Sequence, residues 1–104
     1  MAERKVVWTE TAFRQRREIL KYWTKRNKSP NYAENLIFLI RERIKVISQN
    51  LEAFKFSVFP NTGVSAMGHF SLYYKFFENQ IIIIAFWDNR QNPKKLFKIL
   101  NNEL

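Results

Sequence analysis

The sequence contains no cysteine and only one histidine, and these two scarcities exclude several kinds of site. Without cysteine the chain can form no disulfide, thiolate metal site or cysteine nucleophile. A single histidine does not supply the ligand set of a structural zinc ion. We therefore expect neither a metal nor a cofactor.

Glycine and proline are also scarce, with two and three residues, whereas hydrophobic residues make up 46% of the chain and aromatic residues 16%. This composition excludes a disordered or low-complexity protein. No apolar run reaches the roughly 18–20 residues of a membrane span, and the N-terminus lacks the apolar region of a signal peptide. We expect one soluble, cytoplasmic domain over residues 1–104.

The charge is strongly one-sided, with 18 Lys and Arg residues against nine Asp and Glu, a formal net charge of +9. In so small a domain this excess favours an anionic partner, which could be a nucleic acid, an acidic protein or a membrane surface. A basic surface that serves only solubility is the alternative.

The first helix is predicted from about residue 10 to 25, with Thr9 as its N-cap and Glu10 in its first turn. Its apolar positions form one stripe: Ala12, Phe13, Ile19, Leu20 and Trp23. The basic residues Arg14, Arg17, Lys21 and Lys25 lie away from that stripe. The exposed face of this helix should therefore be basic.

A second helix is predicted over residues 30–49, because Ser29 can cap it and Pro30 suits its first position. Its apolar residues recur every three or four positions: Ala33, Leu36, Ile37, Ile40, Ile44, Ile47 and Leu51. Phe38, Leu39 and Val46 widen the apolar arc toward a neighbour or a partner protein. The short connector predicts an antiparallel helical hairpin.

The remaining segments predict strands and a short helix. Runs 69–77 and 80–87 are rich in aromatic and β-branched residues and are joined by the polar pair 78–79, which indicates a β-hairpin. Residues 4–8 resemble a strand, another strand is expected within 54–68, and residues 60–63 look like a turn. Asn92 followed by Pro93 predicts the start of a C-terminal helix.

This order of elements predicts an α+β fold. An N-terminal strand joins a small, mostly antiparallel sheet of about four strands, and the helical hairpin packs on one face of it. A short C-terminal helix follows. The other face of the sheet is left open, and function is expected there.

Alternation along the hairpin separates two sets of side chains. One face carries His69, Ser71, Tyr73 and Lys75, and the face under the helices carries Phe70, Leu72, Tyr74 and Phe76. A two-residue turn would place His69 opposite Asp88. Asp88 and Arg90 would then share the His69 face with Ile82, Ile84 and Phe86. A three-residue loop would instead shift the register and separate His69 from Asp88.

Several segments resemble the RelE/ParE toxins of bacterial type II toxin–antitoxin systems. They are V-V-W-T-E-T-A at 6–12, F-S-L-Y-Y-K at 70–75, I-I-I-I-A-F-W-D-N-R-Q-N-P at 81–93 and K-K-L at 94–96. The resemblance covers nearly the whole chain and implies a RelE-like fold. It also implies a growth-inhibiting toxin neutralised by an antitoxin, whose acidic, poorly ordered segment wraps it. Because the surface is basic and the second helix broadly apolar, we expect that segment to lie over the helical hairpin and to reach the edge of the sheet. Some members cleave mRNA on the ribosome, and others poison DNA gyrase.

RNA cleavage without metal needs a base for the 2′-hydroxyl and cations for the phosphate. His69 is the candidate base, Arg90 the phosphate ligand and Tyr73 a stacking platform. Asp88 is the group that would orient either Arg90 or His69. Further phosphate contacts are expected from four lysines: Lys55, Lys75, Lys94 and Lys95. The ribonuclease branch carries an arginine just before the hairpin, where this chain has Ala-Met-Gly at 66–68.

Three functions remain open at this point. Ribosome-associated mRNA cleavage is the first expectation, and a non-enzymatic toxin that binds gyrase is the alternative. A plain nucleic-acid-binding domain is the third, although no recognition helix or aromatic strand motif is found. For the site itself, His69 can be purely structural, and Arg90 can simply pair with Asp88.

Overall fold

The computed structural model describes residues 4–49 and 62–103. Its elements follow the predicted order: β1 (Lys5–Trp8), α1 (Glu10–Asn27), α2 (Asn31–Gln49), β2 (Thr62–Met67), β3 (Phe70–Phe76), β4 (Gln80–Asp88) and α3 (Pro93–Glu103). Among the helices described, none is both long and apolar enough to span a membrane. The α+β architecture expected from the sequence is confirmed.

Helix α1 begins and ends with capping interactions. The Oγ1 atom of Thr9 accepts a hydrogen bond from the backbone N–H of Ala12 at 3.1 Å. At the other end Lys28 adopts a left-handed conformation (φ 51°), and its N–H donates to the Lys25 carbonyl at 3.3 Å. This conformation turns the chain sharply enough for α2 to run back beside α1.

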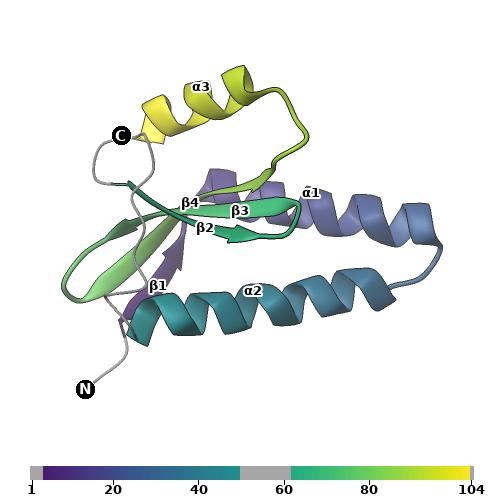
Figure 1. The fold of residues 1–104 in the computed structure, drawn as a ribbon, viewed down its shortest axis with the longest axis horizontal. Coiled ribbons are helices and arrows are strands. Elements are labelled where there is room, and N and C mark those ends of the chain that lie inside the picture. The colour runs from purple at the N-terminus through teal and green to yellow at the C-terminus, as the bar shows by residue number, and fades with distance from the viewer. Residues whose placement is uncertain (1–3, 50–61, 104) are drawn as a thin grey trace.

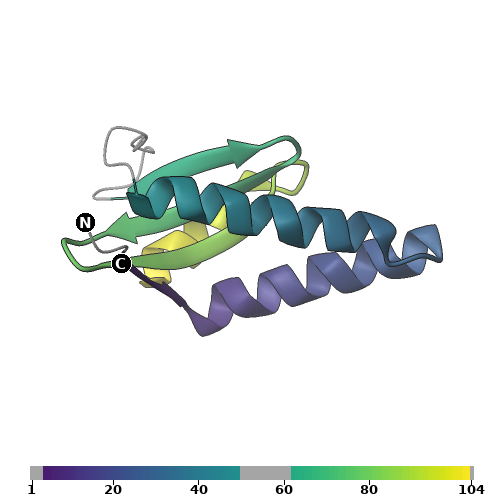
Figure 2. The same cartoon turned by 90° about the horizontal axis from the view of Figure 1, so that it is seen from below.

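The two helices cover one face of the sheet (Figures 1 and 2). The strand order is β1-β4-β3-β2, with β1 parallel to β4 and the other pairs antiparallel. Toward the turn that joins them, helices α1 and α2 extend beyond the ends of the strands (Figure 2). That overhang leaves side chains near the tip free to form a groove with the loop after β4.

The main core lies between the hairpin and the sheet. It comprises Ala12, Leu36, Ile40, Ile47, Phe70, Leu72, Tyr74, Ile81, Ile83 and Phe86. The helix-facing set predicted for the β-hairpin is therefore confirmed for Phe70, Leu72 and Tyr74. Phe13 departs from the predicted stripe, since 46% of it is exposed and its ring lies against the Arg16 guanidinium.

Helix α3 covers part of the sheet face that was expected to be open (Figure 1). Leu96 and Leu100 of α3 are buried there with the strand residues Ile84, Ala85 and Trp87. The reason is amphipathicity: α3 carries Leu96, Ile99 and Leu100 on one side, and burying them stabilises the fold, while Phe97 stays 44% exposed. The second face is thus a second, smaller core.

Strands β3 and β4 are joined by the predicted two-residue turn, because the Phe77 N–H donates to the Gln80 carbonyl at 2.9 Å. The register nevertheless shifts inside the sheet. Tyr74 pairs with Ile83 but Tyr73 pairs with Ala85, so Ile84 is an extra residue in a β-bulge.

The bulge overturns the predicted placement of the hairpin's end. Asp88 pairs with Phe70 rather than with His69, which lies in the turn before β3. Because one inserted residue reverses the alternation, Phe86 enters the main core beneath the helices. Asp88, two residues further on, therefore lies on the helix side and not on the face of Tyr73.

The segment before β2 is only partly tested. Thr62 and Gly63 belong to β2, so the turn predicted over 60–63 is wrong for these two residues, and a strand within 54–68 is confirmed. Residues 50–61, including Lys55 and the alternating run from 54 to 59, lie outside the described residues.

Candidate functional site at the end of β4

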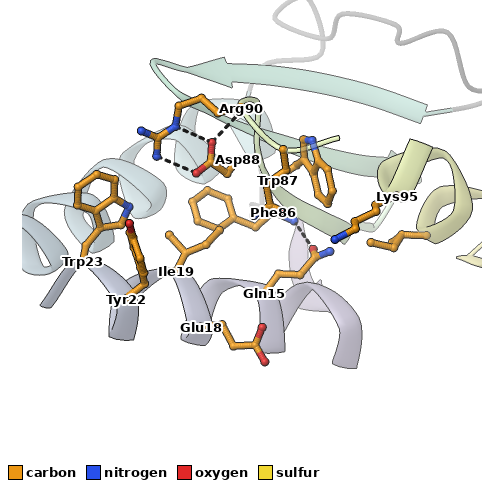
Figure 3. A pocket seen from close by; sticks show the side chains of 12 residues that line it. Gln15, Glu18, Ile19, Tyr22, Trp23, Phe86, Trp87, Asp88, Arg90 and Lys95 are labelled. Atoms are coloured by element: carbon orange, nitrogen blue, oxygen red, sulfur yellow. Dashed lines mark hydrogen bonds and ion pairs between the residues drawn. The ribbon is translucent and has the colours of Figure 1, made fainter. Parts of the chain in front are cut away.

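A groove of about 640 Å³ lies where α1, the end of β4 and α3 meet, here called the β4-end groove (Figure 3). It is lined by Gln15, Glu18, Ile19, Tyr22, Trp23, Phe86, Trp87, Asp88, Arg90, Gln91, Lys95 and Ile99. Three of the predicted site residues therefore meet here: Asp88, Arg90 and Lys95. The groove combines an aromatic wall with charges of both signs.

Arg90 is held by Asp88 through three hydrogen bonds (Figure 3). Its Nε donates to Oδ1 at 3.0 Å, its Nη2 donates to Oδ2 at 2.8 Å, and its backbone N–H also donates to Oδ1 at 3.0 Å. The guanidinium carbon lies 5.3 Å from the ring centroid of Trp23. This pair is the only ion pair within the described ranges and joins the end of β4 to the loop that follows it, whereas the contact with Trp23 links that loop to α1.

The pair also determines the protonation of its members. Hydrogen bonding to Arg90 holds the pKa of Asp88 below its ordinary value, against a smaller opposing effect of burial. The same hydrogen bonds raise the pKa of Arg90. A phosphate that approached Arg90 would have to displace a carboxylate that already uses two of its donor nitrogens.

The loop after β4 is ordered by local hydrogen bonds. The backbone N–H of Asn89 donates to the His69 carbonyl at 2.8 Å, and the Ser71 hydroxyl donates to Asn89 Oδ1 at 3.0 Å. Asn92 caps α3 as predicted, since its Oδ1 accepts from the Lys94 N–H at 3.0 Å. The cap fixes the first turn of α3 and so places Lys95 beside the groove.

Gln15 is a member of this site that the sequence did not indicate. Its Oε1 accepts a hydrogen bond from the backbone N–H of Phe86 at 2.9 Å. The pairing of β1 with β4 ends at Ile83, so this side chain supplies an acceptor where the neighbouring strand has stopped. Nothing in the apolar periodicity of α1 distinguishes Gln15 from an ordinary polar residue.

His69 lies in a different groove, on the far side of Phe70. This second groove has a volume of about 530 Å³ and runs between α2 and the turn joining β2 to β3. It is lined by Tyr32, Leu36, Leu39, Glu42, Arg43, Val46, Met67, Gly68, His69 and Phe70. His69 acts on Asp88 only through its charge, as the weakest of the influences that lower the carboxyl pKa.

The remaining predicted site residues that the structure describes, Tyr73, Lys75 and Lys94, do not line either groove. Tyr73 packs against the core beneath α3, and burial raises the pKa of its hydroxyl. Lys75 lies in β3 on the same side as Tyr73, and Lys94 is exposed in α3. The expected set of His69, Tyr73, Asp88 and Arg90 is thus divided among three places, two of them on opposite faces of the sheet.

The described residues contain no cluster of three or more acidic, histidine or cysteine side chains that would suit a metal ion. The lining of the β4-end groove supplies two carboxylates, two cations, four aromatic side chains and two amides. Such a set can bind an anion, a planar group or a polypeptide segment.

Comparison with known proteins finds a likeness among solved structures. No family model matches the chain, and no curated protein matches it in sequence. Among solved structures, a chain of the chromosomal ParDE TA system from P. aeruginosa superposes with a TM-score of 0.67 at 18% identity. The match covers 81% of this chain and 94% of that one. The protein therefore shares its fold with this chain of the ParDE system.

Proposed function

We propose that this protein is the toxin of a toxin–antitoxin pair and inhibits growth until an acidic antitoxin binds it. The observation that carries the proposal is the fold, which matches a chain of a ParDE toxin–antitoxin system over most of both chains. The net charge of +9 supports an acidic partner. Exposed apolar residues on the helical hairpin, such as Phe38 and Leu39, offer it contact area.

For the target, the geometry favours a toxin that acts by binding, as ParE-like toxins do with DNA gyrase. Metal-free RNA cleavage needs a base and a cation on the same phosphate. The proposed base His69 and the proposed cation Arg90 line separate grooves, and Tyr73 lies on the opposite face. A binding toxin needs only a shaped surface, which the β4-end groove provides.

Ribosome-associated mRNA cleavage remains the second candidate, and one observation favours it. Lys95 and Arg90 line the same groove as Tyr22 and Glu18, which places two cations, an aromatic ring and a carboxylate around one hollow. These groups could serve as phosphate ligands, stacking platform and proton acceptor. In this candidate Glu18, not His69, would take the role of base.

Induced expression with separate readouts of DNA and protein synthesis distinguishes the two candidates. We expect DNA synthesis to stop first, and the purified protein to inhibit supercoiling by gyrase without cutting ribosome-bound mRNA. His69→Gln and Tyr73→Phe should keep full toxicity. Prompt arrest of protein synthesis with cleaved transcripts would overturn the binding mechanism, and normal growth on induction would overturn the toxin proposal itself.

Arg90 gives a sharper test of the site. Arg90→Ala should abolish growth inhibition, since it removes one of the groove's two cations together with its contact to Trp23. Arg90→Lys should weaken inhibition because lysine lacks the planar, bidentate donor geometry. Toxicity is compared with a thermal melt of each variant. Full toxicity in a folded Arg90→Ala protein would place the site elsewhere, and a much lower melting temperature would make Arg90 a structural residue.

A further inference from the structure

Arg16 of α1 has an unusual environment outside the β4-end groove. Its guanidinium carbon lies 4.4 Å from the ring centroid of Trp8 and 4.9 Å from that of Phe13. Both contacts are within the range of cation–π attraction. Phe13 was predicted to be in the core but is 46% exposed, so it forms a platform at the surface beside this arginine.

Arg16 and its neighbour Arg41 have no countercharge within the described part of the chain. No ion pair or hydrogen bond joins either side chain to a described residue, whereas Arg4, for comparison, donates to the Phe77 and Ser48 carbonyls. Burial and, second, the charge of Arg41 lower the pKa of Arg16. Two cations from α1 and α2 therefore stand close together with unused donors, and one of them is already partly desolvated.

An apolar groove begins one helical turn away from this pair. Leu20 follows Arg16 by four positions and Ile37 precedes Arg41 by four, so both lie on the same helix faces as the arginines. With Ala33 they form the apolar part of a hollow of about 460 Å³ between α1 and α2. Its lining also includes the cations Lys21 and Lys25 and one carboxylate, Glu34. Cations and an apolar floor thus follow one another along the outside of the helical hairpin.

We propose that Arg16 and Arg41 together bind carboxylates of an acidic polypeptide segment whose apolar side chains occupy the groove beside Leu20 and Ile37. This rests on the proposed function for its partner, the antitoxin, and goes beyond it by assigning a particular subsite. An acidic peptide fits both halves of the surface. A nucleic acid would meet the cations but would leave its phosphates over an apolar floor, where they lose water without gaining partners.

Arg16 and Arg41 are better placed than Arg90 to receive such a carboxylate. Asp88 already occupies the Arg90 guanidinium, and an incoming anion has to displace it. At Arg16 no described carboxylate has to be displaced, part of the desolvation has already occurred, and the incoming charge relieves the repulsion from Arg41. The repulsion between the two arginines therefore destabilises the free protein and strengthens the binding of a carboxylate.

The test uses the purified full chain and two probes of equal negative charge. One is a synthetic amphipathic peptide of glutamate and leucine, and the other is single-stranded oligothymidylate. Heteronuclear NMR observes the Nε–H of Arg16 and the indole N–H of Trp8. We expect the peptide to shift both signals while the indoles of Trp23 and Trp87 stay in place. Shifts at Trp8 with oligothymidylate but not with the peptide would overturn the proposal in favour of nucleic acid.

Three variants then separate a subsite from general charge attraction. Arg16→Met keeps apolar contact with the rings, and Arg41→Gln changes an exposed side chain, so each should fold and bind the peptide about tenfold more weakly. The matched control Arg14→Gln removes the same charge from an exposed position on α1 and should bind within about twofold of wild type. Equal losses in all three variants would overturn the subsite.

Stability supplies an independent readout. Because Arg41 repels Arg16 in the free protein, Arg41→Gln should leave the melting temperature unchanged or raise it, while lowering the affinity for the peptide. If Arg41 were only structural, the substitution would lower both the melting temperature and the affinity. Growth assays distinguish this proposal from the proposed function. If the peptide binds at Arg16 but the protein does not inhibit growth, the subsite stands and the toxin function is wrong.

Discussion

The two halves of β4 differ in almost every respect. From Gln80 to Ile83 the strand has partners on both sides, β1 in parallel and β3 in antiparallel pairing, and the register follows from the two-residue turn. From Ala85 to Asp88 the strand no longer pairs with β1, and its register with β3 is displaced by one residue. On the side that β1 has left, the Gln15 side chain accepts a hydrogen bond from the Phe86 N–H. The first half is ordinary sheet, and the second half is shaped for a site.

The difference shows how much a single inserted residue can change. Ile84 and Ala85 both contribute to the core under α3, and after them the alternation is reversed. Phe86 then stacks on Phe70 at a centroid distance of 5.3 Å, and Asp88 reaches the α1 side where Trp23 and Arg90 meet. Bulges are common beside functional sites for this reason, because they redirect side chains without ending the sheet.

Deletion of Ile84 is expected to have the largest effect. Without the extra residue, Phe86 and Asp88 would point toward α3 and Trp87 toward the helices, so a large ring would leave each core. The loss should exceed about 4 kcal/mol, enough to unfold a domain of this size. Denaturant unfolding followed by circular dichroism measures it.

Ile84→Val provides the control for this deletion, since it keeps the residue count and the bulge. It should cost only about 0.5–1.5 kcal/mol, the usual result of removing one buried methyl group. A deletion variant that folds with wild-type stability would mean that the bulge does not determine the faces of the second half.

The first half of β4 was predictable and the second was not, for a physical reason. Caps at Thr9 and Asn92 and the apolar period of α2 are local signals, and each was confirmed by a hydrogen bond or by burial. The bulge leaves no such signal. Residues 81–84 are four isoleucines in a row, so the sequence shows no alternation whose reversal could be seen.

The contents of the site were predictable only in part. Asp88 was predicted as an orienting carboxylate and Arg90 and Lys95 as phosphate-binding cations, and the three do line one groove. Two of its four aromatic side chains, Tyr22 and Trp23, come from about 65 positions earlier, by contacts that no local pattern encodes. For Arg90 the sequence left two interpretations open, a phosphate ligand or a simple partner of Asp88, and the structure shows the pair with Asp88.

Removing the Gln15 acceptor tests the open edge of the second half and should have an intermediate effect. Gln15→Ala leaves the partly buried N–H of Phe86 without its partner and should cost about 1–3 kcal/mol. Gln15→Glu keeps an oxygen at the same place and should cost less. Hydrogen exchange at the Phe86 amide should quicken in the alanine variant. Unchanged exchange would show that water replaces Gln15 there at no cost.

The smallest effect is expected from the Asp88–Arg90 pair, because Arg90 is half exposed and exposed ion pairs contribute little. The sign follows from the lowered pKa of Asp88. A carboxyl group whose pKa is lower in the folded than in the unfolded chain stabilises the fold above the unfolded value of about 3.9, and loses that contribution as the pH falls through the folded pKa.

Asp88→Asn should therefore melt about 1–4 °C below wild type at neutral pH, and the gap should close in acid as the wild-type carboxyl becomes protonated. Thermal melts of both proteins across the acid range measure the gap, and taking the difference removes the effect of all other carboxyl groups. A gap that stayed constant from neutral pH into acid would show that Asp88 acts through the shape of its turn rather than its charge. In that case Arg90 would already be free for an anion, and the β4-end groove would no longer differ from the Arg16 cluster in its readiness to bind one.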